Sequence, residues 1–364
     1  MLTVLHTESS KGWGGQEQRT LREASGLKAL GQRPLILCPA EAELGRRAAA
    51  AGIEVLHAPM RKSFDLPAIV RIMRVIARER VDVVNTHSGR DSFLAGLAGR
   101  LAGRRPVIVR TRHLALPITS KISYSVLPHR VVTVSEYVRS YLLGEGIAPE
   151  QVTAIPTGID LERFCAERAP ATLRQELGLG ADEPLIGTVA ILRYRKGHHI
   201  LLEAIPQVLT RFPEARFVFA GNGPQEENIR QAIDRLGLAS RVIMLGLRND
   251  IPNLLNAFDL FVLPTLQEAL GTSFLEAMAM GKPVIGCGVD GVGEVIHDGV
   301  NGFLVAPNEP QQLAERIIAL IEDRRLAATM GRAGQEIVRR DFSVERMCER
   351  MLALYQELVE GRAR

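Results

Sequence analysis

The 364-residue sequence has few cysteines and no long uninterrupted apolar run. Its four cysteines form no CxxC pair, which argues against a disulfide framework or a structural zinc site and favours a reducing compartment (Cys38, Cys165, Cys287, Cys348). No stretch approaches the roughly 20 apolar residues of a membrane span, and the N-terminal residues lack the pattern of a signal peptide. We therefore expect a cytoplasmic protein.

Aromatic residues are also scarce, at 5% of the chain, and no nucleic-acid-binding motif is present. Nucleic acid is therefore not an expected partner. The charge is uneven, because residues 1–160 contain 22 Lys/Arg and 14 Asp/Glu whereas residues 161–364 contain 23 and 27. The basic first half indicates an anionic partner, and both anionic lipid and a phosphorylated substrate remain open.

Short β-branched runs alternate with amphipathic helical stretches, which is typical of parallel sheets covered by helices on both faces. The alternation stops at residues 160–183, read as a linker with a short helix, and then restarts. The sequence therefore predicts an α/β protein with two doubly wound, Rossmann-like domains. Residues 1–165 and a C-terminal helix at about 345–364 form the first, and residues 166–344 form the second. Ligands of such folds bind beyond the carboxyl ends of the strands, here in a shared cleft.

In the first half, a glycine-rich loop follows the first strand, with Gly12, Gly14 and Gly15 in "SSKGWGGQEQR". Such a loop before a helix lets a phosphate approach the backbone, although an ordinary flexible loop remains the alternative. Trp13, the only tryptophan, is a candidate ligand contact. Polar side chains that follow later strands are candidates as well, with structural roles as the alternative (Asn85, His87, Arg112, His113).

In the second half, a basic turn follows the strand at "PLIGTVA" and ends at a glycine before a helix (Arg193, Arg195, Lys196, Gly197). Cations at a helix N-terminus are unfavourable by themselves, and a bound diphosphate would explain them better than solvated surface charge. Gly221 and Gly223 repeat the strand–glycine–helix pattern in "VFAGNGP".

Two glutamates stand eight positions apart in "QEALGTSFLEAMAMGKPVIG". A helix beginning near Thr272 or Ser273 would point its free N–H groups at a ligand. The helix dipole explains one acid near the start of this helix, but it does not explain both Glu268 and Glu276.

This stretch resembles the E-x7-E signature of retaining glycosyltransferases of the GT-B fold, particularly glycosyltransferase family 4. Further similarities extend along most of the chain, in "GWGGQEQ", "VVTVSEYVR", "IPTGIDLERF", "LRYRKGHHILLEA", "NDIPNLLNAFDLFVLPT" and "DGVGEVIHDGVNGFLV". The resemblance implies a nucleotide-sugar-binding second domain and an acceptor-binding first domain.

By this resemblance, Glu268, His113, Arg193 and Lys196 are the expected catalytic residues. Glu276 would bind the ribose, Glu268 and His113 would face the donor sugar, and Arg193 and Lys196 would hold the diphosphate. Further donor contacts would come from small or backbone groups (Gly14, Gly15, Gly221, Gly223, Leu270, Gly271, Thr272, Ser273). The expected acceptor contacts are Trp13, His87 and Arg112. The sequence departs from the family at Ile191, where arginine is common, so Arg195 can share the role of Arg193, and "EALG" replaces the usual "EGFG".

The resemblance implies transfer from a nucleotide-diphosphate sugar to a saccharide or lipid-linked acceptor, with retention, in bacterial envelope polysaccharide or lipopolysaccharide synthesis. The sequence has no DxD near a strand end, so no metal or other cofactor is expected. Arg71, Arg74 and Arg78 share one helix face that could contact anionic lipid at the inner face of the cytoplasmic membrane, with a solvated face as the alternative. A nucleotide-sugar epimerase and a non-catalytic sugar-nucleotide-binding module are the alternative functions.

Overall fold

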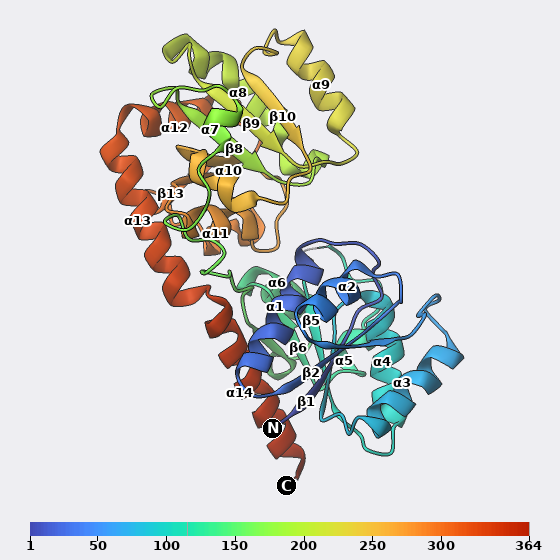
Figure 1. Cartoon of the computed structure of the whole chain (residues 1–364). Coiled ribbons are helices and arrows are strands. Elements are labelled where there is room, and N and C mark those ends of the chain that lie inside the picture. The colour runs from blue at the N-terminus through green and yellow to red at the C-terminus, as the bar shows by residue number, and fades with distance from the viewer. Residues whose placement is uncertain (115, 364) are drawn as a thin grey trace. The chain divides into compact units, whose positions relative to one another are not determined.

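The chain is described by a computed structural model covering residues 1–114 and 116–363. It divides into two compact units, coloured along the chain in Figure 1: Met1–Gly158 with Val344–Arg364, and Ile159–Ser343. The sequence placed the first boundary at 165. It lies earlier because the Ile159 amide donates to the Phe342 carbonyl at 2.7 Å and Ile159 pairs with Ser343, which ties the segment after Gly158 to the second unit.

The first unit contains a seven-stranded parallel sheet in the order β3-β2-β1-β4-β5-β6-β7. The seven strands are short, apolar and rich in β-branched residues, and they alternate with helices as the sequence predicted. The strands are β1 Thr3–Thr7, β2 Arg33–Cys38, β3 Glu54–His57, β4 Val83–Thr86, β5 Val107–Arg112, β6 Arg130–Thr133 and β7 Val152–Ala154.

The helices of the first unit alternate with these strands. They are α1 Gly15–Ala29, α2 Glu43–Ala50, α3 Leu66–Arg78, α4 Gly89–Leu101, α5 Ile122–Ser125, α6 Glu136–Gly144 and the short 3₁₀ helix η1 Pro149–Gln151. Helix α3 begins at Leu66, because the Asp65 side chain accepts the Ala68 amide at 3.2 Å and Pro67 lies in the first turn.

The C-terminal helix α14 (Val344–Ala363) belongs to the first unit although it is last in the chain. Its apolar stripe, including Met347, Met351 and Tyr355, packs in one buried cluster with residues of β1, β4, β5 and β6. The sequence assigned this helix to the first domain, and the cluster shows which apolar surface it covers. No helix in residues 1–114 and 116–363 is long and apolar enough to cross a membrane.

The second unit contains a six-stranded parallel sheet in the order β10-β9-β8-β11-β12-β13. Its strands are β8 Leu185–Val189, β9 Arg216–Ala220, β10 Val242–Gly246, β11 Leu260–Leu263, β12 Val284–Cys287 and β13 Gly302–Val305. Its helices are α7 Leu173–Glu176, η2 Tyr194–Lys196, α8 His198–Arg211, α9 Glu226–Arg235, α10 Ile251–Ala257, α11 Thr272–Ala279, η3 Asp290–Glu294, α12 Pro310–Glu322 and α13 Arg324–Asp341.

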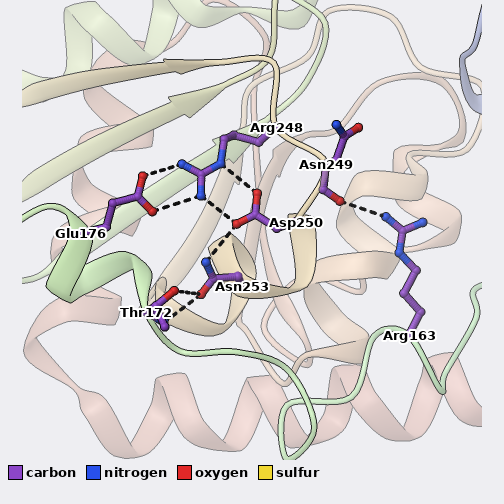
Figure 2. A network of polar contacts seen from close by, with 7 residues as sticks. All are labelled: Arg163, Thr172, Glu176, Arg248, Asn249, Asp250 and Asn253. Carbon is purple, nitrogen blue, oxygen red and sulfur yellow. Dashed lines mark hydrogen bonds and ion pairs between the residues drawn. The ribbon is translucent and has the colours of Figure 1, made fainter.

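The predicted linker, residues 160–183, is fastened to the second unit by the polar network in Figure 2. Arg248 bonds both carboxylate oxygens of Glu176 on α7, at 2.6 and 3.1 Å, and also pairs with Asp250 at 2.7 Å. Asn253 accepts the Thr172 amide at 2.9 Å. The network holds the linker against the start of α10, so this loop is part of the second unit's fold.

Candidate functional site

Glycines in the second unit bring the loop after β8 into direct backbone contact with the loops after β9 and β11. Gly197 has φ +72°, and a Cβ built there would lie 1.8 Å from the Pro264 carbonyl oxygen. A Cβ at Gly221 would lie 2.0 Å from the Ala190 carbonyl oxygen, and one at Gly223 would also clash. These predicted glycines are required by the fold itself, because no side chain fits between the packed backbones.

The β11–α11 loop carries Glu268, whose carboxylate forms an ion pair with the Lys196 ammonium. The two side chains are 19% and 16% exposed, so the pair is well shielded from solvent. The Glu268 amide donates to Asp290 at 3.0 Å, and its carbonyl accepts the Gly291 amide at 3.1 Å. The structure therefore brings together two predicted site residues that lie 72 positions apart in sequence.

Helix α11 begins at Thr272, as the sequence predicted, after Gly271 with φ +92°. The amides of Thr272 and Ser273 are the first of this helix and have no carbonyl to bond within it. Leu270 is buried before the turn, and Glu276 lies half-buried one turn into the helix. The turn therefore presents backbone donors and a carboxylate on one short segment.

The two arginines of the basic turn differ in their exposure to solvent. Arg193 is exposed, whereas Arg195 is half-buried and its Nε has no hydrogen-bond partner among the described residues. The carbonyl of Arg195 accepts the Leu266 amide at 2.7 Å and the Thr265 hydroxyl at 3.0 Å. The backbone of this turn is therefore fixed to the β11 loop, and the side chain of Arg193 extends from it.

In the first unit, the glycine-rich loop ends at Gly14, the N-cap of α1, whose amide donates to Glu17 at 2.8 Å. A Cβ at Gly15 would meet nothing within 4 Å, so the fold does not itself require glycine there. Trp13 packs against the cluster that contains Ala24 and Ile36, and the Arg47 guanidinium lies 4.3 Å from its ring centroid. Trp13 therefore packs partly against the core of the first unit.

Three histidines from the ends of β1, β4 and β5 form a hydrogen-bonded row. His6 Nδ1 and His87 Nε2 are 3.1 Å apart, and so are His87 Nδ1 and His113 Nε2. Burial lowers the pKa of all three, and for His113 the cations Arg19 and Arg112 add to this effect. The row is therefore neutral near pH 7, and the tautomer of each ring is coupled to that of its neighbour.

Two of the predicted acceptor residues, His87 and Arg112, line one pocket together with His113. This pocket has a volume of about 530 Å³ and lies within the first unit. Gln16, from the start of α1, also lines it. The predicted Trp13 is not among the residues that line this pocket, within the part of the chain that the structure describes.

A buried polar network in the first unit was missed by the sequence reasoning. Glu23 accepts the Tyr355 hydroxyl at 2.6 Å, and Asn85 donates to both, at 3.2 Å to Glu23 and 2.8 Å to Tyr355. Asn85 was expected to bind a ligand or to cap its local turn. It instead joins α1 and α14 across long sequence separations, a role that no local pattern could indicate.

Two buried acids at the strand ends were missed as well. Glu8, directly after β1, and Asp91, in the first turn of α4, are both fully buried. Burial, with the nearby Asp91 carboxylate, raises the pKa of Glu8 to about 8. The sequence signal that could have identified Glu8 is an acidic residue immediately after a strand of apolar residues. Nowhere in residues 1–114 and 116–363 do three His, Cys, Asp or Glu side chains gather as metal ligands would.

Comparison with known families covers most of the chain. The model for "Glycosyl transferases group 1" matches residues 171–337, which lie in the second unit. The model for "Glycosyltransferase Family 4" matches residues 13–163, which lie mainly in the first.

Two curated relatives and one solved structure illustrate the similarity. A GDP-mannose-dependent alpha-(1-6)-phosphatidylinositol monomannoside mannosyltransferase of Mycobacterium tuberculosis is 30% identical, with 80% of each chain covered. A UDP-Gal:alpha-D-GlcNAc-diphosphoundecaprenol alpha-1,3-galactosyltransferase of Escherichia coli is 26% identical over 81% of this chain and 80% of its own. The Anabaena protein HepE, solved in complex with UDP and glucose, is 25% identical with a TM-score of 0.85, covering 98% of this chain and all of its own.

Proposed function

This chain belongs to the group 1 and family 4 glycosyltransferases, and from that premise we propose that it transfers a sugar with retention from a nucleoside diphosphate sugar to a hydroxyl group of a saccharide or lipid-linked acceptor. The acceptors named for the relatives include a diphosphoundecaprenol-linked sugar and a phosphatidylinositol mannoside. These names support a role in the synthesis of bacterial envelope polysaccharide or lipopolysaccharide.

The observation that carries the proposal is the Lys196–Glu268 ion pair immediately before the N-terminus of α11. In this proposal, Lys196 and Arg193 hold the donor diphosphate, with the first amides of α11 as further donors. Glu276 binds the ribose, and Glu268 faces the sugar. The glycines of the adjoining loops, Gly221 and Gly223, let the backbone lie close to the ligand.

The chemistry follows from the charge that develops during transfer. The bond between the sugar C1 and the β-phosphate oxygen breaks, and the departing diphosphate keeps the electron pair. Cationic side chains and helix amides stabilise this charge, so we assign no metal to the reaction. The acceptor oxygen bonds to C1 on the face that the phosphate leaves, and its proton passes to the departing phosphate. His113 is assigned to the sugar and Gly14 and Gly15 to the phosphate.

We also propose that the first unit contacts anionic membrane from the cytoplasmic side. On α3 and the loop before it, Phe64 and Leu66 are 66% and 59% exposed, and Arg71 and Arg74 are exposed on the same helix. Apolar side chains next to cations suit the surface of an anionic bilayer.

Sedimentation with vesicles tests the membrane proposal. The full chain should sediment with phosphatidylglycerol vesicles and stay in solution with phosphatidylcholine vesicles, and Phe64→Ser with Leu66→Ser should reduce sedimentation. Leu247→Ser with Val300→Ser, at apolar positions that are 68% and 52% exposed in the second unit, is the matched control. Equal sedimentation of the α3 variant and the parent would contradict the assignment.

A thermal-shift screen against nucleoside diphosphates and their sugars tests the donor site. A nucleotide that stabilises the parent should stabilise Glu276→Ala much less, because this variant loses the ribose hydrogen bonds. Glu315→Ala, at an exposed position on α12, should behave as the parent does. If Glu276→Ala shifts as much as the parent, the ribose assignment is wrong.

Incubation with the donor alone separates transfer from the epimerase alternative. We expect at most slow release of free sugar and nucleoside diphosphate without an acceptor. Conversion of the sugar nucleotide to its epimer would exclude the proposed transfer. Donor binding without turnover for any acceptor, unchanged in Glu268→Ala, would support a non-catalytic module instead.

A further inference from the structure

The pocket of the first unit is lined by more positive charge than a site for neutral sugar hydroxyl groups needs. Arg90, Arg110 and Arg112 all line it, and no Asp or Glu is found among the described lining residues. Acceptor hydroxyl groups alone are neutral and need no such charge. The composition of the pocket therefore points to an anionic group on the molecule that occupies it.

Arg110 and Arg112 are buried, at 6% and 8% exposed. No described acidic residue forms an ion pair with either guanidinium, and the Nε of each has no hydrogen-bond partner among the described residues. Buried charges in proteins are normally paired, because an unpaired charge loses its hydration without compensation. Two unpaired guanidiniums in one pocket are therefore best explained by a ligand that carries the opposite charge.

The protein holds both guanidiniums in place by neutral contacts instead of carboxylates. Arg110 donates to the Ser123 carbonyl at 2.9 Å, and its guanidinium carbon lies 3.5 Å from the centre of the Tyr124 ring. Arg112 donates to the Tyr124 hydroxyl and to the Leu116 carbonyl. Burial lowers the pKa of Arg110 to about 10, which leaves it charged near pH 7. The positive charges are thus fixed but not neutralised.

The N-terminus of α4 lies at the same pocket, which Ser88, Gly89 and Arg90 line. This 13-residue helix presents its positive dipole end and its first amides there. A Cβ at Gly89 would meet nothing within 4 Å, so there is open space beside the first helical residue. The carboxylate of Asp91, in the first turn of α4, is buried and is engaged by the Ser88 and His87 amides, at 2.9 and 2.8 Å.

We propose that this pocket binds an anionic group of the acceptor, a phosphate or a carboxylate, through Arg110, Arg112 and the N-terminus of α4. This inference rests on the proposed transferase function and narrows its acceptor to molecules that carry negative charge near the hydroxyl group that receives the sugar. His87 and His113 line the same pocket, which places the row of histidines next to the bound acceptor.

Calorimetric titration of the full chain tests the inference. With UDP present to occupy the donor site, inorganic phosphate and malonate should bind saturably, and glycerol should not. In Arg112→Gln, phosphate binding should weaken by roughly tenfold or more, because charge-assisted hydrogen bonds are the strong ones. In Arg112→Lys, part of the affinity should return. Arg139→Gln is the matched control, because Arg139 also lies in the first unit and donates to a backbone carbonyl, that of Val152.

The outcomes separate this inference from the donor site. Phosphate binding that survives Lys196→Ala and is lost in Arg112→Gln supports the acceptor pocket. Phosphate binding that is lost in Lys196→Ala and kept in Arg112→Gln places the anion at the donor site and overturns the inference, while the proposed transferase function stands. Absence of phosphate and malonate binding to the parent chain also overturns it, and this measurement does not depend on the folding of any variant.

Comparison of acceptors identifies the source of the anion. Glucose 6-phosphate offers a phosphate monoester on a free sugar, phosphatidylinositol in phosphatidylcholine vesicles offers a phosphodiester on a lipid, and glucose is the neutral control. Under the inference, at least one phosphorylated molecule inhibits phosphate binding competitively and glucose does not. Equal competition by glucose would show that the pocket recognises hydroxyl groups and would contradict the assignment.

Discussion

The two units share one architecture but form their loops at the strand ends in different ways. In the second unit, backbone lies directly on backbone at Gly197 and Gly221, where no side chain fits. In the first, buried polar side chains lie at the strand ends, such as the row His6, His87 and His113. Backbone packed on backbone allows one loop geometry, whereas side chains can be substituted one at a time.

This difference suits a donor site in the second unit and an acceptor site in the first. A nucleoside diphosphate offers the same phosphates and ribose whatever sugar it carries, so backbone amides and a few charges suffice to bind it. Acceptors vary, and discrimination among them requires specific side-chain contacts. Three predictions test this comparison of the two units, in order of decreasing expected effect.

The largest expected effect is that of Lys196→Ala in the second unit. Loss of one preorganised cation at the leaving group should lower kcat by roughly 10²–10³-fold, about 3–4 kcal/mol of transition-state stabilisation. Steady-state rates with a donor found in the nucleotide screen would measure it. Lys282→Ala, which removes an ammonium bonded to the Asn256 carbonyl of the same unit, is the control. Similar rates for both variants would remove Lys196 from the proposed site.

Gly197→Ala should lower the free energy of unfolding by about 3 kcal/mol, a smaller effect. The alanine would have to adopt a left-handed backbone conformation, and its Cβ would clash with the Pro264 carbonyl oxygen. Gly237→Ala is the matched control: it shares the positive φ, +67°, but its Cβ would meet nothing within 4 Å, so it should cost about 1 kcal/mol. Calorimetry of the full chain would measure the loss, and the fluorescence of Trp13, which lies in the first unit, would show whether that unit unfolds in the same transition. Equal losses would show that packing of backbone on backbone is not what requires glycine there.

The smallest expected effect concerns pH and the first unit. Because the pKa of Glu8 is raised to about 8 when folded, against 4.5 for the ordinary side chain, the folded chain holds a proton that the unfolded chain has lost. The unfolding free energy should therefore fall as pH rises through this window, by up to about 1.4 kcal/mol per pH unit. The lowered pKa values of the buried histidines make the unfolding free energy rise with pH below their ordinary pKa of 6.5. The fall due to Glu8 is therefore clearest between pH 6.5 and 8.

Unfolding followed by Trp13 fluorescence across this range would measure the fall. The acids that face Glu8, Asp91 from α4 and Glu17 from α1, remain in Glu8→Gln. The amide oxygen can still accept the Ser10 amide, and the amide nitrogen can donate to Gln16 if the Gln16 side-chain amide turns over. The fall should become shallower in this variant, whereas Glu41→Gln, at an exposed position, should keep it. A parent whose stability is constant from pH 6.5 to 8 would show that Glu8 is ionised in the folded chain.

Much of the fold could be read from local pattern. Strands and helices alternate in both units as the sequence predicted, and α11 begins at Thr272. These features depend on neighbours within a few residues, so the sequence contains the information. The unit boundary at 158 was predicted too late, because it depends on pairing of Ile159 with Ser343, far along the chain.

The alternation of strands and helices, the glycine loops and the family to which the chain belongs all follow from the amino-acid sequence. Which side chains meet depends on the tertiary structure: the strand order β1-β4-β5 aligns the three histidines, and α14 brings Tyr355 to Glu23. The tertiary structure also places the buried Arg110 and Arg112 at a pocket whose described lining residues include no Asp or Glu. Contacts between neighbouring strands depend on strand order and packing, and the same local pattern is compatible with several orders.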